Sequence, residues 1–459
     1  MSFTSINFIF YFLPITFILY YFLNFFKNDR LLNVYLLIVS ILFYLWNDLR
    51  IGIFFLISCF LVFLIGKLIT NSKSKYLLTI SILLLVGVLV YYKYFDFALG
   101  IINRVLHKEI DLIYLTIPLG LSFACFEAIS YLVDVYRGED SGSLIDVLLF
   151  LMFFPKISSG PIVTWNKFNK QLVNRQIDIN NTVNGIERII YGVAKKVIVA
   201  DVLGNFCGEV ISNYQQMDSL TVAIGASCFM LEIYLDFSAY SDIAIGTSLL
   251  FGFKFDENFN YPYRSKSMGE FWRRWHISLG NFFKNYLYIP LGGNRKHVYL
   301  NLFIVFFVSG LWHGNGLAYI VWGIFIGLII CLERYIRDKD FYKNKPNFVK
   351  RLLLMIMIYF SWILFMMPSL SQSIALIKRM FAGIGLGDVV LNVKYYLNNR
   401  LIFTIVIGVI ISFVDVKKII EKNELLKYVV LILLYIKKFN ASLIKPKIRV
   451  YGQVLICAL

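Results

Sequence analysis

Long, continuous apolar runs separated by short polar connectors dominate the chain. A helix needs about 20 apolar residues to cross the hydrocarbon core of a bilayer, and runs near that length recur. Because the runs are continuous rather than alternating, they indicate helices and not a transmembrane β-barrel. We predict about nine to twelve membrane-spanning helices, and the run at 219–251 is long enough for a bent or paired segment. The predicted spans are 6–26, 31–46, 51–69, 76–94, 112–135, 219–251, 299–310, 317–332, 352–367, 401–414 and 426–436.

The connectors predict how these helices are oriented. Nothing basic precedes the run at 6–26, which is longer than a signal-peptide core and is followed by no small-x-small cleavage site, so we expect it to be retained. The basic connectors 27–30 and 67–75 are separated by two predicted spans, which places both on the cytoplasmic side. Further basic connectors occur at 343–351, also predicted to be cytoplasmic, and at 417–427.

Composition narrows the class of protein. Hydrophobic residues make up 59% of the 459 residues and charged residues 16%, whereas a soluble domain carries about 25% charged residues. Basic loops of a membrane protein account for the formal net charge of +17, so nucleic-acid binding is not predicted. The six cysteines are scattered without a CxxC motif and are interpreted as small hydrophobic residues rather than zinc ligands or disulfides.

We interpret residues 1–459 as one integral membrane domain with three regions of different character. Residues 1–110 are plain apolar helices, residues 112–325 contain nearly all the unusual polar chemistry, and residues 340–459 return to apolar spans. The glycine-rich connector 383–387 lacks the third-glycine spacing and the strand–helix setting of a dinucleotide fingerprint, so it is predicted to be a loop.

Two of the four histidines stand out. His107 and His297 lie in polar turns, whereas His313 lies inside a long apolar stretch. An imidazole at membrane depth is costly unless it faces a cavity or a partner, which makes His313 a candidate functional residue. Gly310 and Gly314 nearby allow a ligand or a helix to approach closely. The alternative is a histidine and glycines that serve only helix packing.

His276 borders a stripe of apolar residues that recur at helical spacing. The density of Trp and Arg around it suggests a helix at the membrane interface or one lining a water-filled passage; an ordinary interfacial amphipathic helix is the alternative. The stripe consists of Phe271, Trp275, Leu279, Phe282 and Tyr286.

Carboxylates also occur at membrane depth. Glu232 and Asp236 are four residues apart and share a helix face, which Tyr240 continues, and Asp242 follows. Buried carboxylates need cationic partners. We interpret the group as an ion-paired scaffold that shapes a cavity, and the expected partners are Arg264, Arg273 or Arg274.

Several catalytic motifs are absent from the sequence. It has no HExxH or HxxxH pair that could bind a metal, so no metal site is predicted. It also has no GxSxG nucleophile elbow and no phosphate-binding P-loop. Any acyl transfer is therefore expected to use a histidine as general base rather than a serine triad.

Several segments together resemble the membrane-bound O-acyltransferase family, in particular its bacterial alginate O-acetyltransferase-like branch. The resemblance extends over residues 129–314, and residues 437–459, which are basic where relatives have an apolar final helix, are not covered by it. The segments that carry it are 129–137 (ISYLVDVYR), 154–161 (FPKISSGP), 234–242 (YLDFSAYSD), 271–279 (FWRRWHISL), 286–295 (YLYIPLGGNR) and 310–314 (GLWHG).

The resemblance implies an all-α polytopic membrane protein with interfacial or re-entrant helices around a central tunnel. It maps the family's catalytic histidine onto His313 and its second histidine onto His276. The same resemblance implies a cytoplasmic acyl thioester such as acetyl-CoA as donor, with no bound cofactor. It implies an exported polysaccharide or an extracytoplasmic partner protein as acceptor, and the bacterial cytoplasmic membrane as location. The residues expected to line the tunnel are Trp312, Asn315, Arg273, Arg274, Tyr240, Asp236 and Glu232.

Two alternatives stay open at this point. Within the enzyme class, the alternative is D-alanyl transfer to teichoic acid. In another class, a glycan or proton-coupled transporter would also place His, Glu and Asp inside the membrane. A transporter predicts inverted repeats and paired broken helices, which the sequence does not display.

Overall fold

The computed structural model describes residues 2–113, 115, 117–157, 160–314, 316–382 and 391–416. Within these residues the chain is helical, and its only β-type pairing is an isolated bridge between Met217 and Leu391. The prediction of an all-α polytopic membrane protein is confirmed. The chain divides into two compact units, Met1–Ile189 with Ser241–Glu257 and Ile190–Tyr240 with Asn258–Leu459, and the boundaries fall inside α8 and α10.

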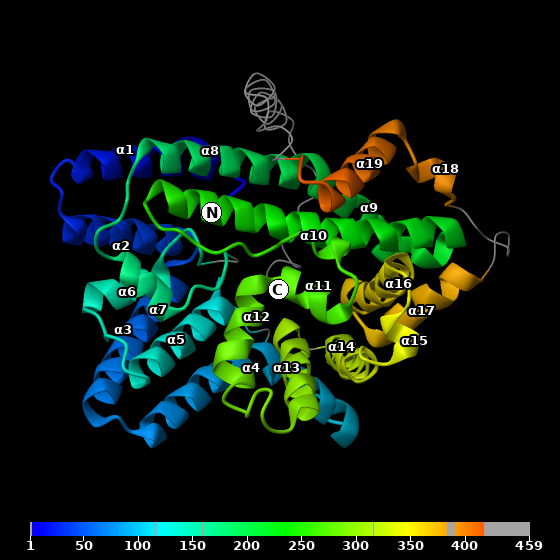
Figure 1. Cartoon of the computed structure of the whole chain (residues 1–459), viewed down its shortest axis with the longest axis horizontal. Helices are drawn as coiled ribbons and strands as arrows, with labels where there is room; N and C mark the ends of the chain where they lie inside the picture. The colour runs from blue at the N-terminus through cyan, green and yellow to red at the C-terminus, as the bar shows by residue number, and fades with distance from the viewer. Residues whose placement is uncertain are drawn as a thin grey trace. The chain divides into compact units, whose positions relative to one another are not determined.

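The first unit contains the helices that precede and include most of α8 (Figure 1). They are η1 (Asn7–Phe12), α1 (Leu13–Asn24), α2 (Asp29–Leu45), α3 (Leu49–Ser72), α4 (Lys75–Leu106), α5 (Leu121–Tyr136), α6 (Leu144–Met152), α7 (Trp165–Phe168), η2 (Asn169–Gln171) and α8 (Ile179–Ala194).

The second unit contains the helices from the end of α8 through most of α10, and those that follow α10 (Figure 1). They are η3 (Lys195–Ala200), α9 (Asp201–Asn213), η4 (Tyr214–Gln216), α10 (Ser219–Leu250), η5 (Pro262–Arg264), α11 (Met268–Arg274), α12 (Ile277–Phe283), η6 (Lys284–Tyr288), α13 (Val298–His313), α14 (Leu317–Ile336), α15 (Asp340–Lys343), α16 (Asn347–Met366), α17 (Leu370–Phe381), α18 (Val393–Tyr396) and α19 (Asn399–Phe413).

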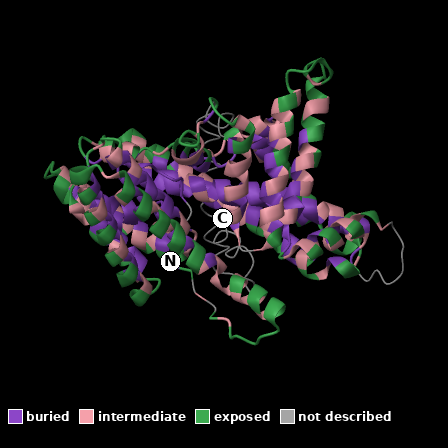
Figure 2. Ribbon diagram, turned by 90° about the horizontal axis from the view of Figure 1, so that it is seen from below, coloured by how far each residue is buried: buried purple, intermediate pink, exposed green. Residues whose placement is uncertain are grey.

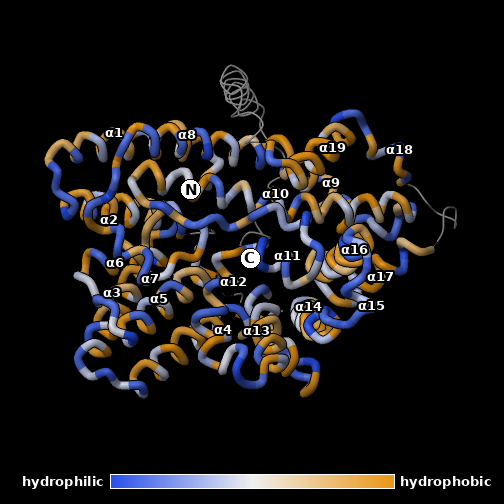
Figure 3. Tube along the Cα trace, in the orientation of Figure 1, coloured by the Kyte–Doolittle hydropathy of each residue, from blue (hydrophilic) through white to orange (hydrophobic). Residues whose placement is uncertain are grey.

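Polar residues in the connectors start the next helix. Asn28, Asp48 and Ser74 precede α2, α3 and α4, and each side chain accepts a hydrogen bond from the backbone N–H three residues later, at 3.1, 3.0 and 3.2 Å. Such caps satisfy donors that have no partner inside the helix. The hydropathy trace in Figure 3 shows the same alternation, with apolar helices and hydrophilic connectors.

Six of the described helices are long and apolar enough to cross a membrane, and each coincides with a predicted span. The predicted spans 299–310 and 401–414 form the shorter apolar helices α13 and α19, and 31–46 forms α2. The predicted span 426–436 lies outside the described residues, as does the basic connector 417–427, and the total number of spans stays a prediction. The six long helices are Asn7–Asn24, Leu49–Ser72, Lys75–Leu106, Ser219–Leu250, Leu317–Ile336 and Asn347–Met366.

One predicted span is wrong at its beginning. The run 112–135 is helical only from Leu121, because Gly120 has a left-handed φ of 70° and Pro118 precedes it. Before that turn, the Asp96 carboxylate of α4 accepts hydrogen bonds from the backbone N–H groups of Ile113 and Leu115 at 2.9 and 3.2 Å. A tertiary contact therefore satisfies these donors where the hydropathy pattern predicted helix.

Burial separates central helices from peripheral ones. In α10, 72% of the most apolar window is buried, against 17% in α4, so α4 presents most of its side chains outward. Figure 2 shows the buried residues in continuous stretches along the helices, with exposed residues gathered on outer faces and connectors. A helix that is apolar on all sides belongs in the interior of a protein or bundle, which explains the position of α10 within the core.

In the first unit, α5 carries a carboxylate that is fully inside the protein. Glu127 forms an ion pair with Lys156, and both side chains are at most 4% exposed. Lys156 Nζ also donates to the carbonyl of Phe150 at 2.5 Å and lies 4.6 Å from the Phe150 ring centroid. Lys156 belongs to the segment 154–161 that the sequence analysis singled out, and its role is to neutralise Glu127.

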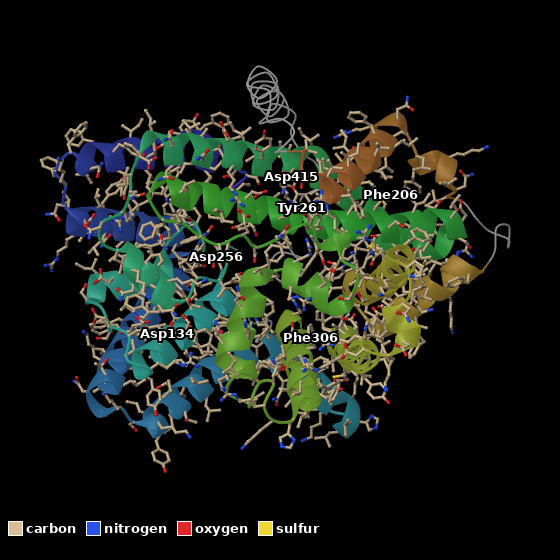
Figure 4. All side chains as sticks on the ribbon, in the orientation of Figure 1. Asp134, Phe206, Asp256, Tyr261, Phe306 and Asp415 are labelled. Carbon is tan, nitrogen blue, oxygen red and sulfur yellow. The ribbon has the colours of Figure 1, made fainter. Side chains whose placement is uncertain are left out.

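Replacing Lys156 by Met should lower the free energy of unfolding by about 3–5 kcal/mol, because it leaves a buried carboxylate without its cation. The measurement is denaturant unfolding in detergent micelles. Lys167→Met is the matched control: Lys167 pairs with Asp256 (labelled in Figure 4), but both side chains are more than half exposed, so it should cost only about 0–1 kcal/mol. Equal losses in the two variants would contradict the prediction.

Candidate active site

His313 is the last residue of α13, and only 5% of its surface is exposed. Its imidazole centroid lies 5.2 Å from the ring of Trp322 on α14, at a nearly perpendicular angle, and 5.0 Å from Phe365 on α16. The ring centroid of Trp312 lies 4.6 Å from that of His313. The imidazole therefore lies in an aromatic cage built by three helices, which removes it from bulk solvent.

Glycine allows two of these helices to touch. A Cβ atom on Gly310 of α13 would lie 2.5 Å from the Tyr319 carbonyl oxygen, and one on Gly323 of α14 would lie 2.6 Å from the carbonyl of Phe306. A Cβ on Gly314 would lie 2.4 Å from the Tyr319 ring. Close backbone approach through small residues is typical of membrane helix pairs. Gly310 thus serves helix contact, and that contact places Trp322 beside His313.

His276 lies in a break between two helices. The prediction that the stripe from Phe271 to Tyr286 lies on one continuous helix is therefore wrong. Helix α11 ends at Arg274, Trp275 is extended, and His276 has a left-handed φ of 44° before α12 begins at Ile277. The stripe residues Phe271, Trp275, Leu279 and Phe282 are nevertheless buried.

Hydrogen bonds to a distant segment cause the break. The Ile277 N–H donates to the Asn258 carbonyl at 2.9 Å, and the Asn260 N–H donates to the Arg274 carbonyl at 2.9 Å. The side-chain oxygen of Asn258 accepts from the backbone N–H and the hydroxyl of Ser278 at 3.2 and 2.9 Å. These bonds satisfy the first turn of α12 from outside the helix and offset the cost of the left-handed residue, of order 1–3 kcal/mol.

The same Asn258 oxygen contacts the His276 imidazole. Nδ1 lies 3.1 Å from Oδ1, and the ring packs edge-on against Phe237 of α10, with centroids 4.7 Å apart. His276 lies between short helices outside the candidate spans, is 3% exposed, and burial lowers its pKa to about 3. The imidazole is therefore neutral over the physiological pH range.

Trp312 joins the two histidines. Its ring lies 4.6 Å from His313 and 6.4 Å from His276, measured between centroids. Residues far apart in the sequence thus meet around one indole, which the sequence analysis did not predict. Both imidazoles are buried in the same unit, and both are positioned by aromatic neighbours.

The carboxylates of α10 have partners that the sequence analysis did not predict. Lys196 of η3 pairs with Asp236 at 2.7 Å and with Asp201 at 2.8 Å. Glu232 lies against Gly204 of α9, where a Cβ would be 3.5 Å from its Oε1. Asp236 is thus ion-paired, with Lys196 as its cation, whereas the interpretation of the whole group as a scaffold that shapes a cavity stays a prediction.

The three arginines named as expected partners bind elsewhere. Arg274 pairs with Glu270 on its own helix at 2.9 Å, Arg264 donates to the Phe413 carbonyl at 2.6 Å, and Arg273 is exposed. In the first unit, Asp242 pairs with Arg188 at 3.0 Å. Local sequence could not identify these partners, because Lys196 and Arg188 lie on helical segments well upstream of Asp236 and Asp242.

The remaining predicted tunnel residues are less informative. Tyr240 is half-buried at the C-terminal end of the α10 portion that belongs to this unit, and Asn315 lies outside the described residues. Arg273 and Arg274 stay predictions as tunnel residues. Asn258, Ser278 and Phe365 were missed. Ser278 lies inside the segment 271–279 but was given no role there, and no motif or periodicity in the sequence distinguishes Asn258 and Phe365.

A separate apolar cavity of about 590 Å³ lies among α10, α16, α17 and α19. The polar groups in its wall are already bonded: Tyr359 donates to the Ala223 carbonyl at 3.0 Å, and Tyr263 donates to the Met230 carbonyl. It contains neither histidine. Among the described residues, no group of three or more His, Cys, Asp or Glu side chains could hold a metal ion.

Comparisons with known proteins show the family of this chain. The model of the membrane-bound O-acyltransferase family matches residues 53–377. The chain is 34% identical over 397 residues to the probable alginate O-acetylase AlgI of Pseudomonas aeruginosa, which covers 83% of this chain and 75% of that protein. It is 30% identical over 420 residues to the peptidoglycan O-acetyltransferase of Helicobacter pylori, covering 83% and 80%. Identity to the teichoic acid D-alanyltransferase of Bacillus subtilis is 28% over 266 residues, covering 54% and 67%.

Gly310→Ala should displace α14 from α13 and lower both stability and activity, because backbone atoms, which cannot move aside like a side chain, occupy the position of the new methyl group. We expect a loss of about 1–3 kcal/mol in the free energy of unfolding. Gly87→Ala in α4 is the control, since nothing lies within 4 Å of its Cβ position, and it should be neutral or slightly stabilising. A Gly310→Ala variant with unchanged stability and activity would contradict the close contact.

Lys196→Met should reduce the yield of folded protein more than Asp236→Asn does. The lysine substitution leaves the buried Asp236 without a cation, at a cost of about 3–5 kcal/mol, whereas Asp236→Asn leaves Lys196 paired with Asp201. Fluorescence-detected size exclusion measures the yield, and catalytic activity is then compared per folded molecule. Normal yield with no activity in Asp236→Asn would contradict a scaffold role.

Proposed function

We propose that this chain, which belongs to the membrane-bound O-acyltransferase family, moves an acetyl group from a cytoplasmic thioester to an exported cell-surface polysaccharide. It is a membrane-bound O-acyltransferase. The observation that carries the finer proposal is the pair of buried histidines that meet around Trp312, within a region similar over most of its length to an alginate O-acetylase and a peptidoglycan O-acetyltransferase.

In the proposed reaction, His313 is the general base. Its imidazole accepts the proton of the acceptor hydroxyl as the oxygen attacks the thioester carbonyl, and it returns the proton to the departing thiolate, so that an ester and a free thiol are formed. A neutral imidazole suits both steps, because its ordinary pKa lies near neutrality. General acid–base catalysis supplies about 10²–10⁴-fold, so the remaining acceleration must come from positioning.

The aromatic cage supports this chemistry by excluding water. Trp312, Trp322 and Phe365 pack against His313, so water has little access to an acyl group that reacts there. Excluding water protects a thioester from hydrolysis and strengthens the polar interactions that remain. The cage therefore favours transfer to a hydroxyl that is delivered to the imidazole over loss of the acyl group to solvent.

His276 takes a different role from His313. Because it stays neutral, its second nitrogen accepts a hydrogen bond from the substrate, either from a neighbouring hydroxyl or from an amide N–H of the thioester donor. We propose that His276 orients the substrate. Proton transfer is assigned to His313 instead, because the family resemblance maps the catalytic histidine onto His313 in the segment 310–314.

The proposal also includes the acyl donor, the membrane and the partner protein. Acetyl-CoA or another cytoplasmic acyl thioester supplies the group, the bacterial cytoplasmic membrane holds the enzyme, and an extracytoplasmic partner protein completes transfer to the polymer. D-alanyl transfer is the second candidate, because part of the chain is also similar to a teichoic acid D-alanyltransferase. Membership of an acyltransferase family removes the ground for a transporter.

His313→Ala should lower the ester-linked acetate on surface glycans by at least about 100-fold, because the general base is lost. Acetate released by mild base is measured in wild-type and variant cells at matched membrane levels of the protein. His107→Asn is the control: His107 is an exposed histidine with a φ of 48°, a conformation that asparagine tolerates, and acetate should be unchanged.

The same hydrolysates decide between the candidates. D-alanine released from wild-type cells and lost in His313→Ala, with no change in acetate, would replace the acetyl proposal by the D-alanyl one. If neither product responds to His313→Ala, acyl transfer centred on this histidine is wrong.

A further inference from the structure

A buried asparagine outside every motif considered so far contacts one of the two histidines. Asn258 is 1% exposed and lies between α10 and η5 in sequence. Its Oδ1 is within hydrogen-bond distance of three groups: the Ser278 N–H at 3.2 Å, the Ser278 hydroxyl at 2.9 Å and His276 Nδ1 at 3.1 Å. A side chain held this firmly is able to determine the state of the group it contacts.

The contacts determine which nitrogen of His276 carries the proton. A backbone N–H can only donate, so the Asn258 atom facing Ser278 must be the amide oxygen and not the nitrogen. A lone pair on Nδ1 would then face the lone pairs of that oxygen at 3.1 Å, which is repulsive. The stable arrangement has a proton on Nδ1, donated to Oδ1, and the lone pair of the neutral ring on Nε2.

We propose that Asn258 is a positioning residue, which locks His276 in the Nδ1–H tautomer and so makes its Nε2 an obligate hydrogen-bond acceptor toward the substrate. The expected effect of Asn258 on catalysis rests on the proposed function. The tautomer itself is a property of the resting protein. Asn258 touches neither donor nor acceptor in this scheme and acts through His276.

The charged groups described on the neighbouring helices are paired with one another. Burial lowers the pKa of His276. On α10, which supplies Phe237, Asp236 is neutralised by Lys196, and on α11 Arg274 is paired with Glu270. The contacts from α12 and α13 come from Ser278 and Trp312, which carry no charge. Among the contacts of Nδ1 in the described residues, Asn258 Oδ1 at 3.1 Å is closer than the Ser278 hydroxyl at 3.4 Å, and it favours a proton on Nδ1.

Nitrogen NMR of the resting protein tests the tautomer directly. The chain has only four histidines, so ¹⁵N-histidine labelling in lipid nanodiscs produces few signals, and His276→Gln assigns the relevant pair. At pH 7 we expect Nδ1 to be protonated and Nε2 to be unprotonated. A wild-type spectrum with the proton on Nε2 would overturn the proposal, whatever the enzyme's activity.

Substitutions at position 258 separate positioning from folding. Asn258→Leu removes the acceptor, and we expect the proton to move to Nε2 in the fraction that folds. Asn258→Asp keeps an acceptor for Ser278 and brings a negative charge to Nδ1–H, which raises the pKa of His276 toward its ordinary value of about 6.5. The ring should then titrate between about pH 5 and about pH 8, where the wild-type ring does not. The exposed Asn281→Asp on α12 is the matched control.

The glycan acetate assay measures the catalytic consequence. Asn258→Leu should lower acetate per folded molecule by about 10–100-fold, the usual effect of losing a group that orients a functional imidazole. Asn258→Asp should restore part of this activity, and Asn281→Asp should match wild type. An unchanged His276 titration in Asn258→Asp would overturn the positioning role. If the wild-type protein has the expected tautomer but its cells carry no ester-linked acetate, only the proposed function is overturned.

Discussion

A polar group buried in this protein must find its partner inside the protein, because neither lipid nor the packed core supplies water to satisfy it. Three sets of contacts meet this constraint. Lys156 neutralises Glu127 in the first unit, Lys196 neutralises Asp236 in the second, and Asn258 with Ser278 receives the imidazole of His276. Each set joins segments that are distant in the sequence, so each also holds the tertiary structure together.

The active-site geometry follows from this constraint together with close helix packing. Gly310 and Gly323 bring α13 and α14 into backbone contact, which places Trp322 beside His313 at the end of α13. The hydrogen bonds of Asn258 break the helix that the apolar stripe predicted, and that break turns His276 toward Phe237 and within reach of Trp312. Two histidines from different helices thus share one aromatic environment.

The two imidazoles are chemically distinct because their surroundings differ. His276 has its Nδ1 bound to an amide oxygen and is kept neutral by burial, which suits a fixed hydrogen-bond acceptor. His313 lies among aromatic rings, an environment that shields a reacting group from water. The proposed division of labour, with proton transfer at His313 and orientation at His276, uses this difference and the established membership of an O-acyltransferase family.

Hydropathy and motif were enough to identify the membrane class, most helix positions, the enzyme family and the candidate histidines. These features are local or depend on short runs of residues, so a linear pattern records them. The break at His276, the start of α5 at Leu121, the pairing of Asp236 with Lys196 and the contact of Asn258 with His276 were decided only by the tertiary structure. In each case a hydrogen bond or ion pair to a distant segment outweighs local helical preference, and the position of that segment is not encoded in the periodicity around it.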